Sequence, residues 1–75
     1  MMKADYDELH LALARNATGA HAHIAHKADY YLYKLIDKPN ARFSNCSQDA
    51  FISKVRRALG LGEWDELSDI MGRWW

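Results

Sequence analysis

Three histidines lie close together at positions 21, 23 and 26, and imidazole is a common ligand for zinc and similar ions. On a helix, residues two apart point about 200° away from each other, so His21 and His23 cannot share one ion. His23 and His26 share a face, and Asp29 or Tyr30 would be their further ligands. We interpret the three as a polar helix surface and expect no metal or other cofactor. A metal site and a pH-sensing helix are the alternatives.

Two further residues are candidates for chemistry. His10 lies between Leu9 and Leu13 on an apolar stripe, where a hydrogen-bonded histidine at a helix contact is expected. Cys46 is the single cysteine, which excludes an intramolecular disulfide and fits a reducing compartment. Nucleophilic catalysis requires a nucleophile, a base and an oxyanion hole, and the sequence places no histidine beside Cys46. We therefore expect a protein that is not an enzyme.

Length and composition indicate one small folded domain, residues 1–75. The chain has 75 residues, of which 49% are hydrophobic and 27% charged, as in globular proteins. A domain of this size buries only about 60% of its extended surface, so a lone monomer is expected to be marginally stable. Basic and acidic residues number 10 each, which excludes a global field toward nucleic acid or membrane. Without a signal peptide or a long apolar segment, we expect a cytoplasmic protein and no membrane partner.

Residues 4–37 are predicted to be helical, because they contain no proline and only one glycine. An apolar stripe with steps of three or four residues runs through the whole segment and keeps its phase across residues 16–19. This continuity predicts one helix of about 33 residues, about 50 Å long. A tight turn between two helices at Asn16-Ala17-Thr18-Gly19 is the alternative. Pro39 ends the segment near Asp37.

The apolar stripe predicts a homodimer. Its first half is narrow and rich in small residues, which leaves it without a cover inside the monomer, and a second copy would bury it. The predicted interface comprises Leu9, Leu13, Ala17, Ala20 and Ile24. Residues 30–36 are instead apolar on most of the helix circumference, so we expect the later helices to bury them from several sides.

Two shorter helices are predicted after a basic loop. Ser47 is a plausible N-cap, and Gly60 is expected to end the first of these helices. Phe51, Val55 and Ala58 form its buried face. The last helix is expected from about residue 62 to 74. The fold class is therefore all-α: a long N-terminal helix, either continuous or broken near Gly19, and two shorter helices in a small bundle, expected to be dimeric.

Residues 51–72 resemble the first two helices of helix-turn-helix domains in phage-repressor-type proteins. The matching positions are Ala58, Leu59, Gly60, Glu66, Leu67, Ile70, Met71 and Gly72. In that family the next helix reads the major groove of DNA, and here the sequence ends at Arg73-Trp74-Trp75. The last predicted helix is also acidic, so phosphate would repel it. The resemblance therefore implies a DNA-binding ancestry in which the recognition helix is missing.

Basic residues and terminal tryptophans are the candidate partner-binding residues. Residues 38–60 contain five basic side chains and one acidic one, whereas residues 61–75 contain one basic and four acidic ones. Tryptophan and arginine are frequent at protein interfaces, so we predict a protein partner contacted by Lys54, Arg56, Arg57, Trp74 and Trp75. We expect a small regulator or inhibitor of the kind that phages and mobile elements encode. A DNA-binding regulator is the alternative, and a histidine-based metal-binding protein a more distant one.

Overall fold

The computed structural model describes residues 2–16, 19–38, 40 and 47–71. These residues form four α-helices and no strand, which confirms the predicted all-α class: α1 (Lys3–Arg15), α2 (Ala22–Asp37), α3 (Gln48–Leu61) and α4 (Trp64–Met71). The chain divides into two compact units, Met1–Ala41 and Arg42–Trp75, and each is described by itself. The prediction of one helical domain stays a prediction. Within the described residues, every helix is too short or too polar to cross a membrane.

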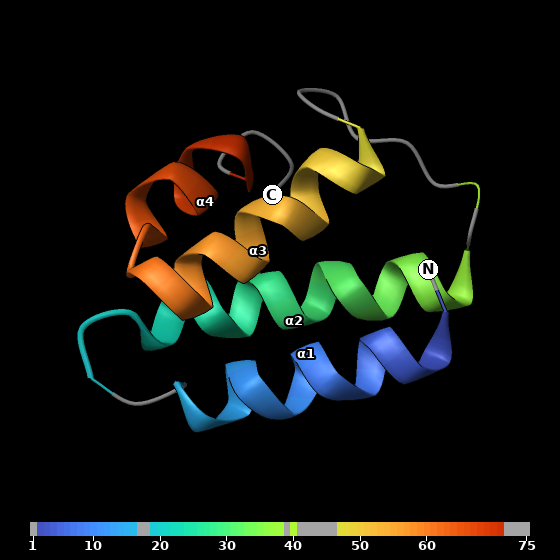
Figure 1. Cartoon of the computed structure of the whole chain (residues 1–75), viewed down its shortest axis with the longest axis horizontal. Coiled ribbons are helices and arrows are strands. Elements are labelled where there is room, and N and C mark those ends of the chain that lie inside the picture. The colour runs from blue at the N-terminus through green and yellow to red at the C-terminus, as the bar shows by residue number, and fades with distance from the viewer. Residues whose placement is uncertain (1, 17–18, 39, 41–46, 72–75) are drawn as a thin grey trace. The chain divides into compact units, whose positions relative to one another are not determined.

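The first unit is a hairpin of two helices, so the prediction of one continuous helix is wrong. Helix α1 ends at Arg15 and α2 begins at Ala22, and the two pack side by side in opposite directions (Figure 1). Asn16 caps the end of α1, where its side-chain amide donates a hydrogen bond to the carbonyl of Ala12 at 2.8 Å. Gly19 has φ +85°, a left-handed conformation that glycine adopts easily and that ends a right-handed helix. The structure therefore agrees with the alternative prediction, in which the chain turns between two helices near Gly19.

The predicted dimer stripe is largely used inside the monomer. Leu9 and Leu13 are 2% and 1% exposed, because the chain folds back on itself after α1. Ile24 is half-buried and Ala20 is exposed, while Ala17 lies outside the described residues. The premise that this stripe has no cover in the monomer is therefore wrong for Leu9 and Leu13, and the homodimer stays a prediction.

Burial in the second half of α2 is one-sided. Tyr31, Leu32 and Leu35 are buried, whereas Tyr30 and Tyr33 are 45% and 56% exposed. The prediction that residues 30–36 are buried from several sides is wrong for these two tyrosines. Tyrosine tolerates this position because its hydroxyl group remains hydrated while its ring covers apolar surface. Helix α2 ends at Asp37, as the proline two residues later predicts.

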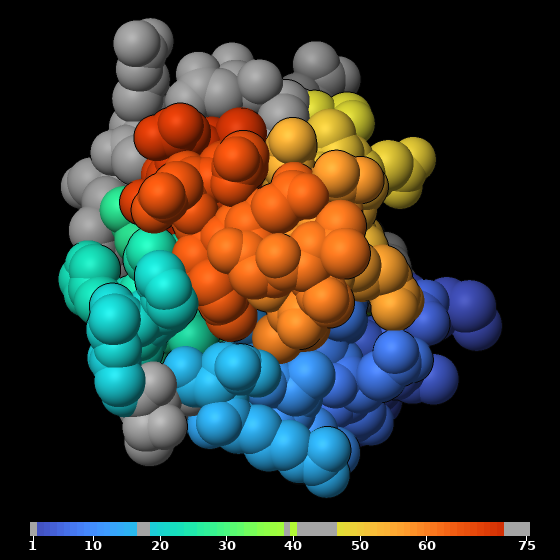
Figure 2. All heavy atoms as spheres, turned by 60° about the vertical axis from the view of Figure 1, so that its left-hand side comes forward, coloured from blue at the N-terminus to red at the C-terminus, as the bar shows by residue number. Residues whose placement is uncertain are grey.

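The second unit is a shorter pair of helices, α3 and α4, whose side chains pack against each other (Figure 2). The Ser47 hydroxyl accepts a hydrogen bond from the Ala50 amide at 3.1 Å, which confirms the predicted N-cap. The predicted stop at Gly60 is wrong, because α3 continues to Leu61 and ends at Gly62, which has φ +74°. The buried residues are Phe51, Val55 and Ala58 of α3 and Trp64, Leu67 and Met71 of α4. Helix α4 begins two residues later than predicted, and residues 72–74 of the predicted helix lie outside the described residues.

Candidate functional site

A histidine and an aspartate face each other across the α1–α2 hairpin. Nδ1 of His10 lies 2.6 Å from Oδ1 of Asp29, and the two side chains are 43% and 33% exposed. An ionised carboxylate only accepts hydrogen bonds, so Nδ1–H of His10 donates to Asp29. This geometry confirms the prediction of a hydrogen-bonded histidine at a helix contact. It also leaves Nε2, on the far side of the ring from Asp29, as the second functional atom of the imidazole.

Tyr6 completes a three-residue cluster, which we call the His10 cluster: Tyr6, His10 and Asp29. The Tyr6 and His10 rings, one helical turn apart on α1, are stacked with centroids 5.5 Å apart and planes 10° apart. Burial raises the pKa of the Tyr6 phenol above 10.0, and the negative charges of Asp29 and Asp7 raise it further. The stack fixes the plane of the imidazole, and the acids make the local potential negative.

A second group of aromatic side chains lies on what we call the outer face of α2, formed by His23, His26, Tyr30 and Tyr33. All four are exposed, at positions three or four residues apart that place them in one row on the helix. The Lys34 ammonium lies 4.7 Å from the centroid of the Tyr30 ring, which is cation–π distance. Helix formation thus puts exposed aromatic rings on one face and buried leucines on the opposite one.

The structure adds no further ligand to the histidine pair that the sequence singled out. His21 is the N-cap residue of α2, and His23 and His26 lie in its first turns. In residues 2–16, 19–38, 40 and 47–71 there is no group of three histidine, cysteine, aspartate or glutamate side chains that could hold a metal ion. Cys46 lies outside these residues.

The predicted basic residues lie on α3, and Arg57 is bound within the chain. Nε and Nη2 of Arg57 donate to the two carboxylate oxygens of Glu63, each at 2.9 Å. The turn at Gly62 brings Glu63 back to the end of α3, which makes this two-point contact possible. The hydrogen bonds from Arg57 lower the pKa of Glu63 below 4.5, and Lys54 lowers it further by its charge. The same contact raises the pKa of Arg57.

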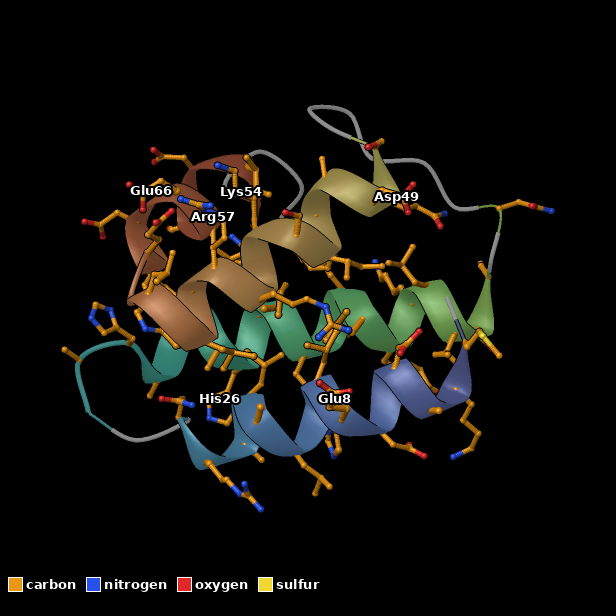
Figure 3. All side chains as sticks on the ribbon, viewed as in Figure 1. Glu8, His26, Asp49, Lys54, Arg57 and Glu66 are labelled. Atoms are coloured by element: carbon orange, nitrogen blue, oxygen red, sulfur yellow. The ribbon has the colours of Figure 1, made fainter. Side chains whose placement is uncertain are left out.

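Acidic residues surround the basic ones on the second unit. Lys54, Arg57 and Glu66 project from the same side of the α3–α4 pair (Figure 3). Arg56 is exposed on α3. Trp74 and Trp75, the other predicted partner-binding residues, lie outside the described residues. The structure therefore brings Lys54 and Arg57 together with glutamates, which reduces the positive field that these two residues would present alone.

Asp29 is the site residue that the sequence did not identify in this role. It was considered as a ligand beside His23 and His26, and it instead binds His10, which lies 19 positions earlier in the sequence. On one continuous helix the two residues would be about 28 Å apart. Only the turn after α1 brings them together, so the signal that could have identified the pair was the turn sequence Asn16 to Gly19.

No family model matches the chain, and no curated protein or solved structure shows significant similarity to it.

Proposed function

We propose that this protein is a small non-enzymatic helical protein that binds a larger protein partner and regulates or inhibits it in the cytoplasm. The observation that carries the proposal is the outer face of α2, where Tyr30 and Tyr33 are 45% and 56% exposed. Tyrosine is enriched at protein interfaces because its ring supplies a large contact area and loses little conformational entropy on binding. Two such residues one turn apart on a helix form a suitable anchor for a partner.

The basic residues give weaker support to partner binding than the sequence suggested. Both carboxylate oxygens of Glu63 are engaged by Arg57, so a partner acid would have to compete with an existing two-point contact. Lys54 and Arg56 therefore stand as secondary candidates. Tyr30 and Tyr33 are 45% and 56% exposed, which is why we place the centre of the interface on α2.

The alternative function, a DNA-binding regulator of the helix-turn-helix type, is less well supported. DNA binding depends on basic side chains that neutralise phosphates. Here Arg57 is held by Glu63, and Asp65, Glu66 and Asp69 follow on α4. The resemblance of residues 51–72 to repressor domains remains a prediction.

Affinity capture from a lysate of the source organism tests the proposal. Wild-type protein is compared with three variants: Tyr30→Ala/Tyr33→Ala, Lys54→Ala/Arg56→Ala, and Leu11→Ala as a matched control. Leu11 is 57% exposed on the other helix of the same hairpin, so its loss removes an apolar side chain elsewhere. We expect one partner to be retained by wild type and by the Leu11 variant and lost by the tyrosine variant. Equal capture by the tyrosine variant, or loss only in the Lys54/Arg56 variant, would contradict the location on α2.

A further inference from the structure

The histidines of the described residues differ in how their rings are held. His10 donates from Nδ1 to a carboxylate at 2.6 Å and stacks on Tyr6. Within the part of the chain that the structure describes, neither His23 nor His26 forms a hydrogen bond or an ion pair. Both are exposed on α2. His10 is thus an oriented imidazole, and His23 and His26 are exposed ones for comparison.

The contact with Asp29 selects the tautomer of the neutral His10 ring. With the proton on Nδ1 held by the carboxylate, the neutral ring carries its lone pair on Nε2. A carboxylate at Nδ1 also stabilises the positive charge that the ring acquires when Nε2 forms a bond, as in the histidine–aspartate pair of serine hydrolases. The His10 side chain is 43% exposed although Nδ1 contacts Asp29 of α2, so it is partly open to solvent.

The charges around His10 determine which electrophile the ring accepts. Asp29 contacts it directly and Asp7 lies three residues before it on α1, and these two carboxylates make the potential at the ring negative. Lys3 contributes the opposite charge, but its ammonium is paired with Asp7 at 3.2 Å. A dianionic phosphoryl donor would be repelled by this potential. A neutral acyl donor would not.

We propose that Nε2 of His10 is a nucleophilic site that accepts an acyl group from a neutral, activated ester, with Asp29 as its positioning residue. Nε2 attacks the carbonyl carbon and forms a C–N bond, while the C–O bond breaks and its electron pair leaves with the alcohol or phenol oxygen. The acylated ring is cationic and keeps its Nδ1 proton against Asp29. Water then attacks the acyl carbon and the C–N bond breaks, which releases a carboxylic acid, the neutral ring and one proton. That proton passes to solvent or to the alcohol or phenol oxygen that left in the first step. This is the reactivity of one oriented imidazole toward activated esters, without a base or an oxyanion hole, and it is separate from the non-enzymatic partner binding proposed above.

Acetylation by p-nitrophenyl acetate tests the proposal on the full chain. Release of p-nitrophenolate gives the total rate, and mass spectrometry of quenched peptides gives the acetyl label on each histidine. We expect His10 to be labelled about tenfold faster than His23 and His26 in the wild-type protein. Asp29→Asn should lower the His10 rate about fivefold and leave the other two unchanged, with the helical circular dichroism preserved. The matched control His23→Gln/His26→Gln should leave the rate of His10 labelling unchanged, and the difference in total rate between wild type and His10→Gln should equal that labelling rate.

Two results would overturn the proposal: equal labelling of His10, His23 and His26 in the wild-type protein, or a His10 rate unaffected by Asp29→Asn. The first needs no variant, so it decides the question even if His10→Gln does not fold. Neither result bears on capture of a protein partner through Tyr30 and Tyr33, so the two proposals fail separately.

Discussion

The hydrogen bond between His10 and Asp29 predicts an energetic coupling between α1 and α2 that a double-mutant cycle measures. The cycle comprises wild type, His10→Ala, Asp29→Ala and the double variant. A hydrogen bond to a charged group contributes about 1.5–3 kcal/mol when shielded, whereas an exposed ion pair contributes about 0.2–1 kcal/mol. The 2.6 Å contact lies between side chains that are 43% and 33% exposed, so we expect a coupling of about 1 kcal/mol. Gains in helix propensity from alanine appear in both arms of the cycle and cancel.

Native-state hydrogen exchange is the assay, because it reports the opening free energy of the α1 and α2 amides separately from those of α3. The Lys3–Asp7 pair of α1 is the control. It joins residues four apart on one helix at 3.2 Å, with side chains 80% and 54% exposed, and its cycle should give less than about 0.5 kcal/mol. A His10–Asp29 coupling below about 0.3 kcal/mol, or one no larger than that of Lys3–Asp7, would refute the reasoning that this contact joins the two helices.

Three further predictions concern the glycines and the titratable groups. A Cβ would find open space at both Gly60 and Gly62. Gly60 lies inside α3, so Gly60→Ala should stabilise the helix by about 0.5–1 kcal/mol, whereas Gly62 has φ +74°, so Gly62→Ala should destabilise it by about 1 kcal/mol. Hydrogen exchange of the α3 amides measures both changes. Burial raises the pKa of Tyr31 above 10.0, so the contribution of Tyr31 to stability is complete below pH 10.0 and is lost as the pH rises through the folded-state pKa. Urea unfolding between pH 9 and about 11.5 should therefore show falling stability, and Tyr31→Phe should make this fall smaller. Arg57 lowers the pKa of Glu63, so the contribution of this contact is present above pH 4.5 and is lost as the pH falls through the folded-state value; Glu63→Gln should flatten the acid side of the α3 exchange profile, and an unchanged profile would contradict the pairing.

Local features of the fold could be predicted from the sequence because neighbouring residues determine them. The Ser47 cap depends only on the Ser47 hydroxyl and on the Ala50 amide three residues later, which donates to it. The end of α2 follows from the backbone restriction that Pro39 imposes on the residue before it. The buried face of α3 follows from the spacing of Phe51, Val55 and Ala58.

The hairpin could not be predicted from periodicity. The apolar stripe keeps its phase across residues 16–19, so the turn leaves no break in the pattern. The decision between helix and turn depends on a glycine penalty of about 1 kcal/mol and on the packing gained when α2 folds back. That packing includes Leu9, Leu13 and the His10–Asp29 bond, which form only after the turn has formed.

Gly60 and the tyrosines of α2 illustrate two other limits. Gly60 and Gly62, separated by one residue, are equally good candidates for the helix end in the sequence. Only the positive φ of Gly62 shows that α3 ends there. Tyr30 and Tyr33 counted as apolar in the run of residues 30–36, although tyrosine is amphipathic, and the structure leaves both partly exposed. The candidate interface was missed for this reason.

Site-specific photocrosslinking tests the central claim, that a protein partner binds the outer face of α2, most directly. A benzophenone amino acid replaces Tyr33 in one sample and Leu11 in a matched one, both being exposed positions of the same hairpin. On irradiation in lysate, we predict one crosslinked partner at position 33 that unlabelled wild-type protein competes away, and none at position 11. The claim is contradicted if position 33 gives no competed product, or if position 11 captures the same protein with equal yield.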